Sequence, residues 1–489
     1  MERQMAAAIQ AVREGRIPFQ EQEGAQYAVV RFPDGRRLVA VSGKRNPGEG
    51  MEGAVAEADG SRVFCGPLSA NNAYELMRRF PYAAPRPHRG VPFTLGLGDR
   101  LGTASRGHIR AVRGRGVFPV LAQQSMRELA LTGRTYEEVL AAAAFAVFEE
   151  RFEDGYGADG DHLKTPDEIR YALGCGYTMI TLDCSEHIDN TVAGQAETDI
   201  LARYDALPAD LRARYEDKYL GRPVPSVPGA PVSRETLARI VLIYHDAVDY
   251  TIRIYRECIA SAGRPIDFEM SIDETATPTD PAAHYVVARE LLEAGVEVTS
   301  LAPRFCGEFQ KGIDYIGDAG RFAEEFEQHA RIADRLGYKI SVHSGSDKFT
   351  VFPAVGRCTG GRVHVKTAGT SWLEAVRLVA ERDPALYREL HAFALDHIDE
   401  AKKYYHIGTS VSTIPALAST PDPELAGYLD RDDSRQALHI TYGLILQERD
   451  EAGGFRFRDR LNACLHEGDD AYARMLERHI LRHLAALGR

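Results

Sequence analysis

The chain has no paired-cysteine motif, no excess of positive charge and no long apolar run. Its seven cysteines are scattered and never spaced as Cys-x-x-Cys, which argues against a disulfide framework and a zinc finger. The net charge of −12 disfavours a nucleic-acid partner, because such a partner needs a basic face. An anionic substrate would therefore need a local cluster of lysine or arginine.

No segment approaches the roughly 18 consecutive apolar residues of a membrane-spanning helix. The first residues, Met-Glu-Arg-Gln-Met, lack the apolar core of a signal peptide. We therefore expect a cytoplasmic protein without a membrane partner. The oligomeric state is left open by the sequence.

The first part of the chain, residues 1–85, predicts a small α+β region. Residues 26–32 and 37–42 are largely apolar, β-prone runs on either side of a Pro-Asp-Gly turn, which indicates a β-hairpin. Residues 2–15 before it predict a helix. A stretch rich in proline and arginine then leads into a different pattern.

From about residue 90 to 415, apolar strand-like runs alternate with helical periodicity. The predicted strands are 93–97, 119–122, 178–183, 266–271, 296–301, 339–343, 362–365 and 406–412, with 157–163 as a further short strand. The predicted helices are 136–150, 235–262, 281–294, 318–336, 371–381 and 384–403. About eight such units indicate an α/β fold, a (β/α)₈ TIM-type barrel with right-handed crossovers. A doubly wound open sheet is the alternative, disfavoured because no Gly-x-Gly-x-x-Gly opens a helix.

Two further regions flank or interrupt this catalytic barrel. Residues 189–231 form a long polar insertion after a strand, for which a lid is our first expectation. Residues 420–489 predict C-terminal helices at 436–448 and 468–487, a helical cap.

Three histidines sit where strand-like runs give way to glycine-rich loops. His343 and His364 end or interrupt apolar runs, and His162 follows Asp161 in a Gly-Ala-Asp-Gly-Asp-His run. Imidazole and carboxylate ligands favour a divalent zinc, manganese, iron, cobalt or nickel ion. We predict His162, His343 and His364 as metal ligands, against the alternative of structural histidines bonded within the fold.

Acidic residues near the same strand ends are candidates for catalysis. Glu269 lies in an apolar strand, where a carboxylate is costly to bury without a partner. It is predicted as a fourth metal ligand or a proton carrier, and a salt bridge to a lysine on a neighbouring strand is the alternative. Asp161 is the first choice for the general base and Asp183 the second.

Polar residues in these loops are predicted to bind the substrate. Lys348, Lys366 and Arg127 would hold an anionic group, since each follows a predicted strand. Hydroxyl groups of the substrate would contact polar side chains nearby. The remaining predicted substrate-binding residues are Gln124, Ser125, Lys164, Thr181, Asp273 and Ser344.

Several long motifs carry a family resemblance. They include Gly-Leu-Gly-Asp-Arg-Leu-Gly at 96–102, Thr-Leu-Asp-Cys-Ser-Glu-His at 181–187 and Ser-Val-His-Ser-Gly-Ser-Asp-Lys at 341–348. With the runs at 119–129, 154–164 and 364–369, they resemble the tagaturonate epimerase family in order along the barrel. The resemblance implies a metal-dependent isomerase that interconverts D-tagaturonate and D-fructuronate in hexuronate catabolism. Members described as ketose 4-epimerases make tagatose and fructose alternative substrates.

The implied reaction inverts a carbinol carbon β to a ketone. That C–H bond is not acidified by the carbonyl, so retro-aldol cleavage and re-addition is the expected route. A nicotinamide-assisted route lacks its sequence fingerprint here. A class II-type aldolase that releases its fragments and a non-catalytic sugar-acid sensor are competing interpretations, and the density of His, Asp and Glu at strand ends disfavours the sensor.

Overall fold

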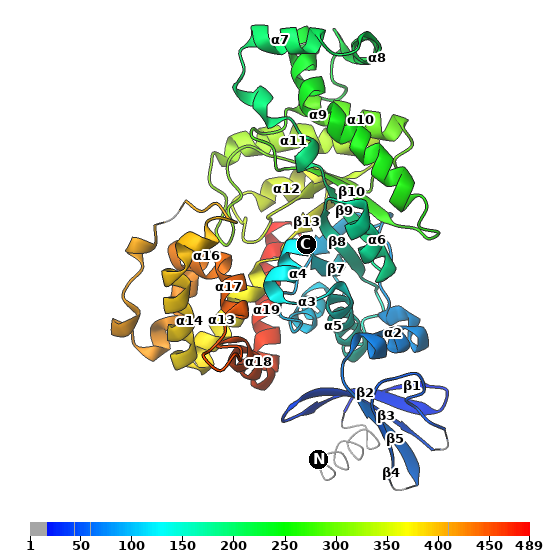
Figure 1. The fold of residues 1–489 in the computed structure, drawn as a ribbon, viewed down its shortest axis with the longest axis vertical. Coiled ribbons are helices and arrows are strands. Elements are labelled where there is room, and N and C mark those ends of the chain that lie inside the picture. The colour runs from blue at the N-terminus through cyan, green and yellow to red at the C-terminus, as the bar shows by residue number, and fades with distance from the viewer. Residues whose placement is uncertain (1–16, 44, 59, 409) are drawn as a thin grey trace.

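Eight parallel strands close into a barrel at the centre of the molecule (Figure 1). A computed structural model describes residues 17–43, 45–58, 60–408 and 410–489. Strand β13 pairs with β6 and closes the ring, so the predicted TIM-type barrel is confirmed. The strands are β6 (Phe93–Gly96), β7 (Phe118–Gln124), β8 (Gly157–Leu163), β9 (Met179–Asp183), β10 (Asp267–Ile272), β11 (Ser300–Pro303), β12 (Lys339–Val342) and β13 (Val363–Lys366).

Helices follow the strands and surround the barrel. Three of them, α4, α5 and α6, begin with capping boxes, in which a Ser or Thr side chain and a Glu side chain satisfy the free backbone N–H groups. A π-helical turn, η4 (Tyr255–Ile259), continues α9. The helices are α3 (Ser105–Val112), α4 (Met126–Thr132), α5 (Tyr136–Glu149), α6 (Pro166–Gly174), α9 (Arg234–Ile254), α10 (Pro281–Glu293), α11 (Ala319–Leu336), α12 (Phe352–Thr359) and α13 (Thr370–Arg382).

One predicted barrel strand is wrong. Residues 406–412, apart from 409, form no strand, and a short 3-10 helix, η5 (Val411–Thr413), begins within them. The eighth place is taken by β8, the glycine- and aspartate-rich run at 157–163, which pairs with both β7 and β9. The segment around 406 instead lies at the barrel mouth, where Gly408 N donates to Gln310 Oε1 at 2.7 Å.

The barrel interior contains an unusual number of polar side chains. Barrel cores are normally filled by branched aliphatic residues. Here Asp159, Thr181, Glu269 and His364 are all fully buried on the strands. In the strand register Glu269 lies beside Thr181, and His364 lies beside Thr94. Each of these groups needs a partner, because an unpaired buried polar group is costly.

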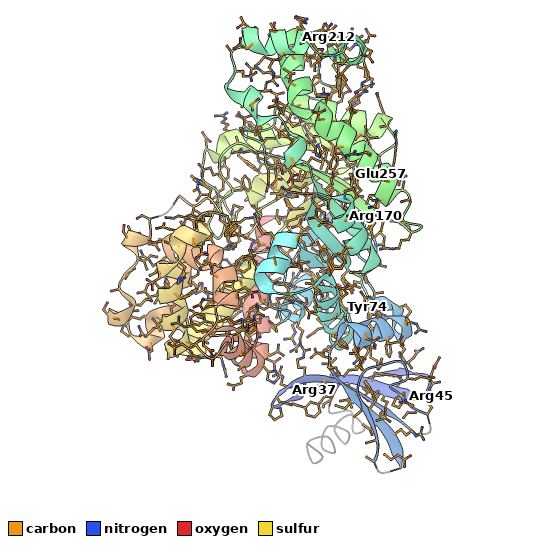
Figure 2. All side chains as sticks on the ribbon, in the orientation of Figure 1. Arg37, Arg45, Tyr74, Arg170, Arg212 and Glu257 are labelled. Carbon is orange, nitrogen blue, oxygen red and sulfur yellow. The ribbon has the colours of Figure 1, made fainter. Side chains whose placement is uncertain are left out.

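A five-stranded antiparallel sheet precedes the barrel. Its order is β1-β2-β3-β5-β4, and β2 and β3 form the predicted hairpin, with Phe32 opposite Gly35 at the turn. The helix predicted at 2–15 lies outside the described residues. Helix α2 joins the sheet to the barrel, where Tyr74 donates to the Cys175 carbonyl at 3.0 Å (Figure 2). The elements are β1 (Gln20–Gln22), β2 (Ala25–Phe32), β3 (Gly35–Ser42), β4 (Ala54–Ala58), β5 (Ser61–Gly66), α2 (Ala70–Arg79) and η1 (Pro81–Ala83).

The insertion after β9 packs on α9 and α10. Lys218 on α8 contacts Glu290 on α10 at 2.7 Å, and Arg212 lies at the outer end of the molecule (Figure 2). No residue of 189–231 lines the pocket described below. A lid role for this segment therefore stays a prediction. Its elements are η3 (Asn190–Gly194), α7 (Glu197–Asp205) and α8 (Ala209–Tyr219), and the short η2 (Ser185–His187) precedes it.

The C-terminal helices form the predicted cap and have a hydrophobic core of their own around Trp372. Helix α19 packs on α3 at Gly107, where a Cβ atom would lie 2.6 Å from Leu476 Cβ. Only glycine permits that close approach. The elements are α14 (Pro384–Asp396), α15 (Ile398–Ala401), η6 (Leu417–Ser419), η7 (Asp422–Asp430), α16 (Asp432–Ile440), α17 (Tyr442–Gln447), α18 (Arg458–Glu467) and α19 (Asp469–Ala486).

Two absences predicted from the sequence concern the whole fold. All seven cysteines carry free thiols. In the part of the chain that the structure describes, no helix is both long and apolar enough to cross a membrane.

A buried ionic cluster connects the C-terminal helical cap to the loop after β12. Asp347, in that loop, contacts His479 Nε2 at 2.5 Å and Arg435 at 2.5 Å. His479 Nδ1 lies 3.2 Å from Glu374 Oε1, so both ring nitrogens face carboxylates. Burial lowers the pKa of His479, but Asp347 and Glu374 outweigh burial and raise it to about 9.

We predict that His479→Gln lowers the free energy of unfolding by about 2 kcal/mol at pH 6, since a hydrogen bond to a charged group is lost. The folded-state pKa of His479 lies above the unfolded value of about 6.5. Its contribution is therefore complete below pH 6.5 and disappears as pH rises through about 9. Urea unfolding at pH 6 and pH 9.5 should show the gap between variant and wild type narrowing. The same change at the exposed His406 is the control, and an unchanged gap would contradict the ionic assignment.

Candidate active site

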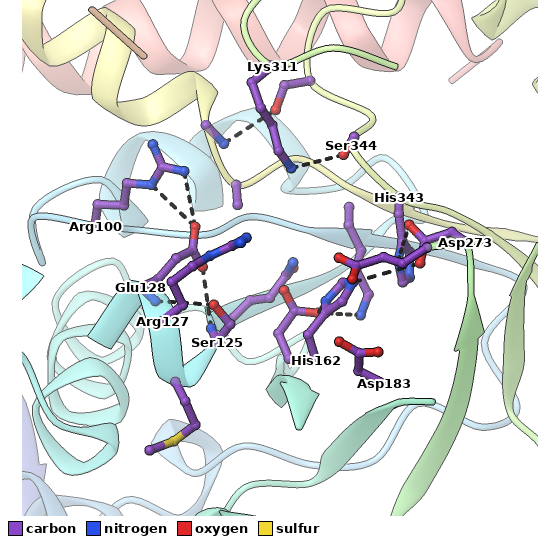
Figure 3. A pocket seen from close by; sticks show the side chains of 18 of the residues that line it. Arg100, Ser125, Arg127, Glu128, His162, Asp183, Asp273, Lys311, His343 and Ser344 are labelled. Carbon is purple, nitrogen blue, oxygen red and sulfur yellow. Dashed lines mark hydrogen bonds and ion pairs between the residues drawn. The ribbon is translucent and has the colours of Figure 1, made fainter. Parts of the chain in front are cut away.

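A pocket of about 360 Å³ opens at the carboxyl ends of the barrel strands (Figure 3). Its walls come from the loops after β6, β7, β8, β9, β10, β11, β12 and β13, and His439 of α16 adds a side chain from the cap. The carboxyl ends of barrel strands are where catalytic groups collect in this fold. The lining is dominated by charged and polar residues.

His162 lies near the end of β8 in a strained backbone conformation. Its φ of 53° is in the left-handed region, and the pairing of β8 with β9 shifts register between Gly160 and Leu163. Such strain costs about 1–3 kcal/mol and persists only where the surroundings impose it. Asp161 Oδ1 lies 2.9 Å from His162 Nδ1, which leaves Nε2 to face the pocket, 3.9 Å from Asp273 Oδ1.

His343 approaches the same point from the end of β12. Its Nε2 lies 2.7 Å from Glu269 Oε1, and its Nδ1 lies 3.3 Å from Asp273 Oδ2. The ring centroids of His343 and His162 are 4.8 Å apart. Burial lowers the pKa of His343, but Asp273 and Glu269 outweigh burial and raise it to about 10.

His162, Asp273 and His343 could together hold a metal ion. One ligand atom from each lies within 4.8 Å of the others. His343 Nδ1 is buried and faces Asp273 Oδ2 at 3.3 Å, so a metal ion bound there would take the place of the proton between the two groups. Each imidazole has a carboxylate behind its other nitrogen, the arrangement that orients metal-binding histidines. Two imidazoles and one carboxylate suit manganese, iron, cobalt, nickel or zinc.

Lys366 lies beneath this group, inside the barrel. Its ammonium group contacts Asp161 Oδ1 at 2.7 Å, Asp159 Oδ2 at 2.9 Å and Glu269 Oε1 at 2.9 Å. Thr181 Oγ1 accepts a further hydrogen bond at 2.5 Å. Burial lowers the pKa of Lys366, but these carboxylates outweigh burial and hold it well above its usual range. The charged ammonium therefore fixes Asp161 and Glu269, the two carboxylates that orient the histidines.

Most residues predicted from the sequence meet at this pocket. The predicted residues that line it are Ser125, Arg127, Asp161, His162, Lys164, Asp183, Asp273, His343, Ser344 and Lys366. The predicted residues that do not line it are Gln124, Thr181, Glu269, Lys348 and His364. Thr181 and Glu269 still contact the group from below, through Lys366 and His343.

Three predicted residues lie apart from the pocket. His364 Nδ1 bonds Thr94 Oγ1 at 2.7 Å, deeper in the barrel, and its ring stacks on His88. Lys348 donates to three backbone carbonyls in the neighbouring loops. The Gln124 amide is buried without a hydrogen bond to any described side chain or backbone group. The structure thus brings none of these three to the substrate space.

Several lining residues were not predicted. Arg100 and Glu128 form a buried ion pair at 3.1 Å, and Glu128 is also the capping-box residue of α4. The capping box was readable from Ser125-x-x-Glu128, but the ion pair joins two loops and has no local signal. Lys311 has no local signal in the sequence beyond being a basic residue after a predicted strand. The other unpredicted polar residues of the lining are Glu168, Glu274, Ser346 and His439.

The fold and this pocket define a (β/α)₈-barrel enzyme with a paired-histidine, carboxylate site at the barrel mouth. The family model for tagaturonate epimerase matches residues 18–487. The tagaturonate/fructuronate epimerase of Thermotoga maritima is 38% identical over 474 residues, covering 96% of this chain and 95% of that protein.

Solved structures agree with this match. The native fructuronate-tagaturonate epimerase from Cohnella laeviribosi superposes with a TM-score of 0.94 at 48% identity, covering 99% of each chain. A form of that enzyme with one glycerol gives 0.95, with the same identity and coverage. This chain therefore belongs to the tagaturonate epimerase family, and it is an isomerase of the epimerase class.

We predict that Lys366→Met destabilises the fold by about 3–5 kcal/mol at pH 8, because it leaves buried carboxylates without a counter-charge. Their pKa values in the folded variant should rise above the unfolded values, so the variant regains stability as pH falls. Urea unfolding at pH 8 and pH 5.5 measures this. A double variant, Lys366→Met with Asp159→Asn, removes one carboxylate and should recover part of the loss. An equal loss at both pH values would instead indicate a packing defect.

Proposed function

We propose that this chain interconverts D-tagaturonate and D-fructuronate by metal-assisted retro-aldol cleavage and re-addition. The observation that carries the proposal is the convergence of His162, Asp273 and His343, each histidine backed by a carboxylate. The relatives named for these two substrates match nearly the whole chain, which supports the choice of substrate.

His162 Nε2, His343 Nδ1 and a carboxylate oxygen of Asp273 would hold the divalent ion. When bound, such an ion supplies Lewis acidity that draws electron density from the substrate ketone. Glu269 supports this site from behind His343, and His364 lies too deep in the barrel to join it. This ligand set differs from the one predicted from the sequence, which combined three histidines with Glu269 as a possible fourth ligand.

A base must remove the proton of the β-hydroxyl group. Asp183 is the better candidate, because it lines the pocket and its Oδ2 lies 3.7 Å from Lys164 Nζ, farther from a cation than Asp161 Oδ1, which is 2.7 Å from Lys366 Nζ. Asp161 is held between Lys366 and His162, which keep its pKa well below its usual range against the effect of burial. So low a pKa makes Asp161 a weak proton acceptor.

The reaction then follows from the substrate. As Asp183 takes the hydroxyl proton, the bond between the α and β carbons breaks, and its electron pair passes to the α carbon and the ketone oxygen. The β carbon becomes an aldehyde, which rotates to present its other face. The α carbon attacks that face, the bond reforms, and Asp183 returns the proton to the new alkoxide. No atom is gained or lost.

The remaining polar groups would bind the substrate around this centre. Ser125, Ser344 and Lys164 line the pocket with groups that can bond hydroxyls. Arg127 lines it too and makes no ion pair with a described carboxylate, so it is available to an anionic group. Lys348 and Lys366, by contrast, are already fully bonded within the protein.

The function is tested by turnover of D-fructuronate and D-tagaturonate before and after chelation, with metal added back. We expect interconversion that chelation abolishes and one divalent ion restores. His343→Ala should lose bound metal as well as turnover, measured by metal analysis of the purified protein. Asp183→Asn is the matched variant, expected to retain metal and lose turnover by about 100-fold or more.

Turnover that survives complete chelation would remove the metal from the mechanism. Release of two fragments instead of one isomer would identify an aldolase. Activity confined to tagatose and fructose would identify a ketose epimerase.

Retro-aldol chemistry predicts that the hydrogen on the inverted carbon never leaves it. Turnover in D₂O should therefore give product without deuterium at that carbon, measured by proton NMR. The substrate hydroxyl protons exchange freely and serve as the internal control for complete solvent exchange. Deuterium on the inverted carbon would contradict the cleavage mechanism and indicate direct proton transfer at that carbon instead.

A further inference from the structure

The basic residues of the pocket differ in whether the protein neutralises them. Arg100 is paired with Glu128 at 3.1 Å, and Lys164 with Glu186 at 3.2 Å. Lys366 is surrounded by carboxylates. Lys311 makes no ion pair within the described ranges, and its Nζ donates one hydrogen bond, to Ser344 Oγ at 2.9 Å (Figure 3).

Lys311 is only half-buried in overall exposure, but its ammonium faces the pocket rather than bulk solvent. Burial lowers the pKa of Lys311, and the neighbouring Arg127 and Arg100 lower it further, whereas the carboxylates of Glu128 and Asp273 act in the opposite direction without forming an ion pair with it. An ammonium placed among other cations without a counter-ion is energetically costly. A ligand that brings a negative charge removes that cost.

The backbone around Lys311 is held in place before any ligand arrives. The carbonyls of Gln310 and Ile313 accept hydrogen bonds from Lys348 Nζ at 2.9 and 2.6 Å. The Gly312 carbonyl accepts from Arg435 Nε at 2.7 Å. Lys348 thus fixes the backbone of the loop that carries Lys311. A cation held in place before binding loses less entropy when it binds an anion.

Lys311 also lies where the carboxylate of a bound sugar acid is expected. Its partner Ser344 directly follows His343, one of the three residues of the metal-type group. A hexulose acid carries its carboxylate at the end of the chain remote from the ketone, two carbons beyond the carbon that is inverted. A substrate bound with that carbon beside His343 can therefore place its carboxylate at Lys311.

We propose that Lys311, supported by the Ser344 hydroxyl, recognises the substrate carboxylate and gives this site its preference for sugar acids over neutral ketoses. The proposal rests on the proposed function for the identity of the substrates. A neutral ketose carries a CH₂OH group at the same position. That group leaves the ammonium without a counter-ion, so the acid is favoured.

The test compares kcat/KM for D-tagaturonate and D-tagatose in the wild type, Lys311→Met and Lys311→Arg. Lys311→Met should lower the value for the acid by about 10- to 100-fold, the cost of one charge-assisted hydrogen bond, mainly through KM. The value for the ketose should change far less, and Lys311→Arg should restore part of the preference. Lys403→Met removes one charge from an exposed lysine and is the control for long-range electrostatics.

A binding experiment separates this proposal from the proposed function. Calorimetry of the metal-loaded protein measures affinity for D-galactonate and for its neutral counterpart galactitol, neither of which is a substrate. Lys311→Met should weaken galactonate binding by a similar factor and leave galactitol binding unchanged, which also shows that the variant is folded. If the wild type binds galactonate through Lys311 yet interconverts neither acid, the proposed function fails and this inference stands.

Two results overturn the inference. Equal losses for acid and ketose, with unchanged galactonate affinity, would assign Lys311 to the chemical step. If the wild type interconverts the acids and Lys311→Met has the same kcat/KM for them, the substrate carboxylate would instead be assigned to Arg127.

Discussion

The contact on which the site depends is that between the Lys366 ammonium and the carboxylates of Asp161 and Glu269. These two carboxylates are the groups that orient His162 and His343. Without the ammonium, three acidic side chains would be buried together inside the barrel, at a cost of about 3–5 kcal/mol. The polar core is therefore not a defect of packing but the support of the pocket above it.

This arrangement also supports backbone strain. His162 and Ser344 both have positive φ values, 53° and 50°, and both face the pocket. Neither residue type adopts that region without cost. Each is hydrogen-bonded to a charged neighbour, Asp161 in one case and Lys311 in the other. Strained residues held by such contacts are typical of sites whose geometry must be exact.

The strand-and-helix pattern was sufficient to predict the barrel, because most strands are continuous apolar runs with turn residues on either side. It also gave β8 the correct bounds as a further short strand, although its Gly-Ala-Asp-Gly-Asp-His sequence is stabilised by partners on distant strands rather than by its own propensity. The segment 406–412 contains β-branched residues and was therefore predicted as a strand, but the closed ring of eight strands does not include it.

The sequence predicted which kinds of residue lie near the site better than it predicted what each residue does there. His343 and His364 have similar local sequences, yet His343 follows the last residue of β12, whereas His364 is the second residue of β13 and lies deeper. Lys348 is fully buried and donates to backbone carbonyls, whereas Lys311 is half-buried and its ammonium reaches Ser344 at the pocket, a difference set by tertiary structure. Local sequence places a side chain near a strand end, but the depth and partner that decide its role depend on register and on loops from elsewhere.

The position of Lys366 along the chain has a consequence for synthesis. Asp159 and Asp161 leave the ribosome 207 and 205 residues before the lysine that neutralises them. The strand that carries Lys366 is also the one whose pairing with β6 closes the ring. A growing chain that ends before β13 thus carries its acidic strands without their counter-ion, and their mutual repulsion opposes early collapse into an incomplete barrel. The strand that closes the ring therefore also carries the counter-ion, and both become available only when about three quarters of the protein has been made.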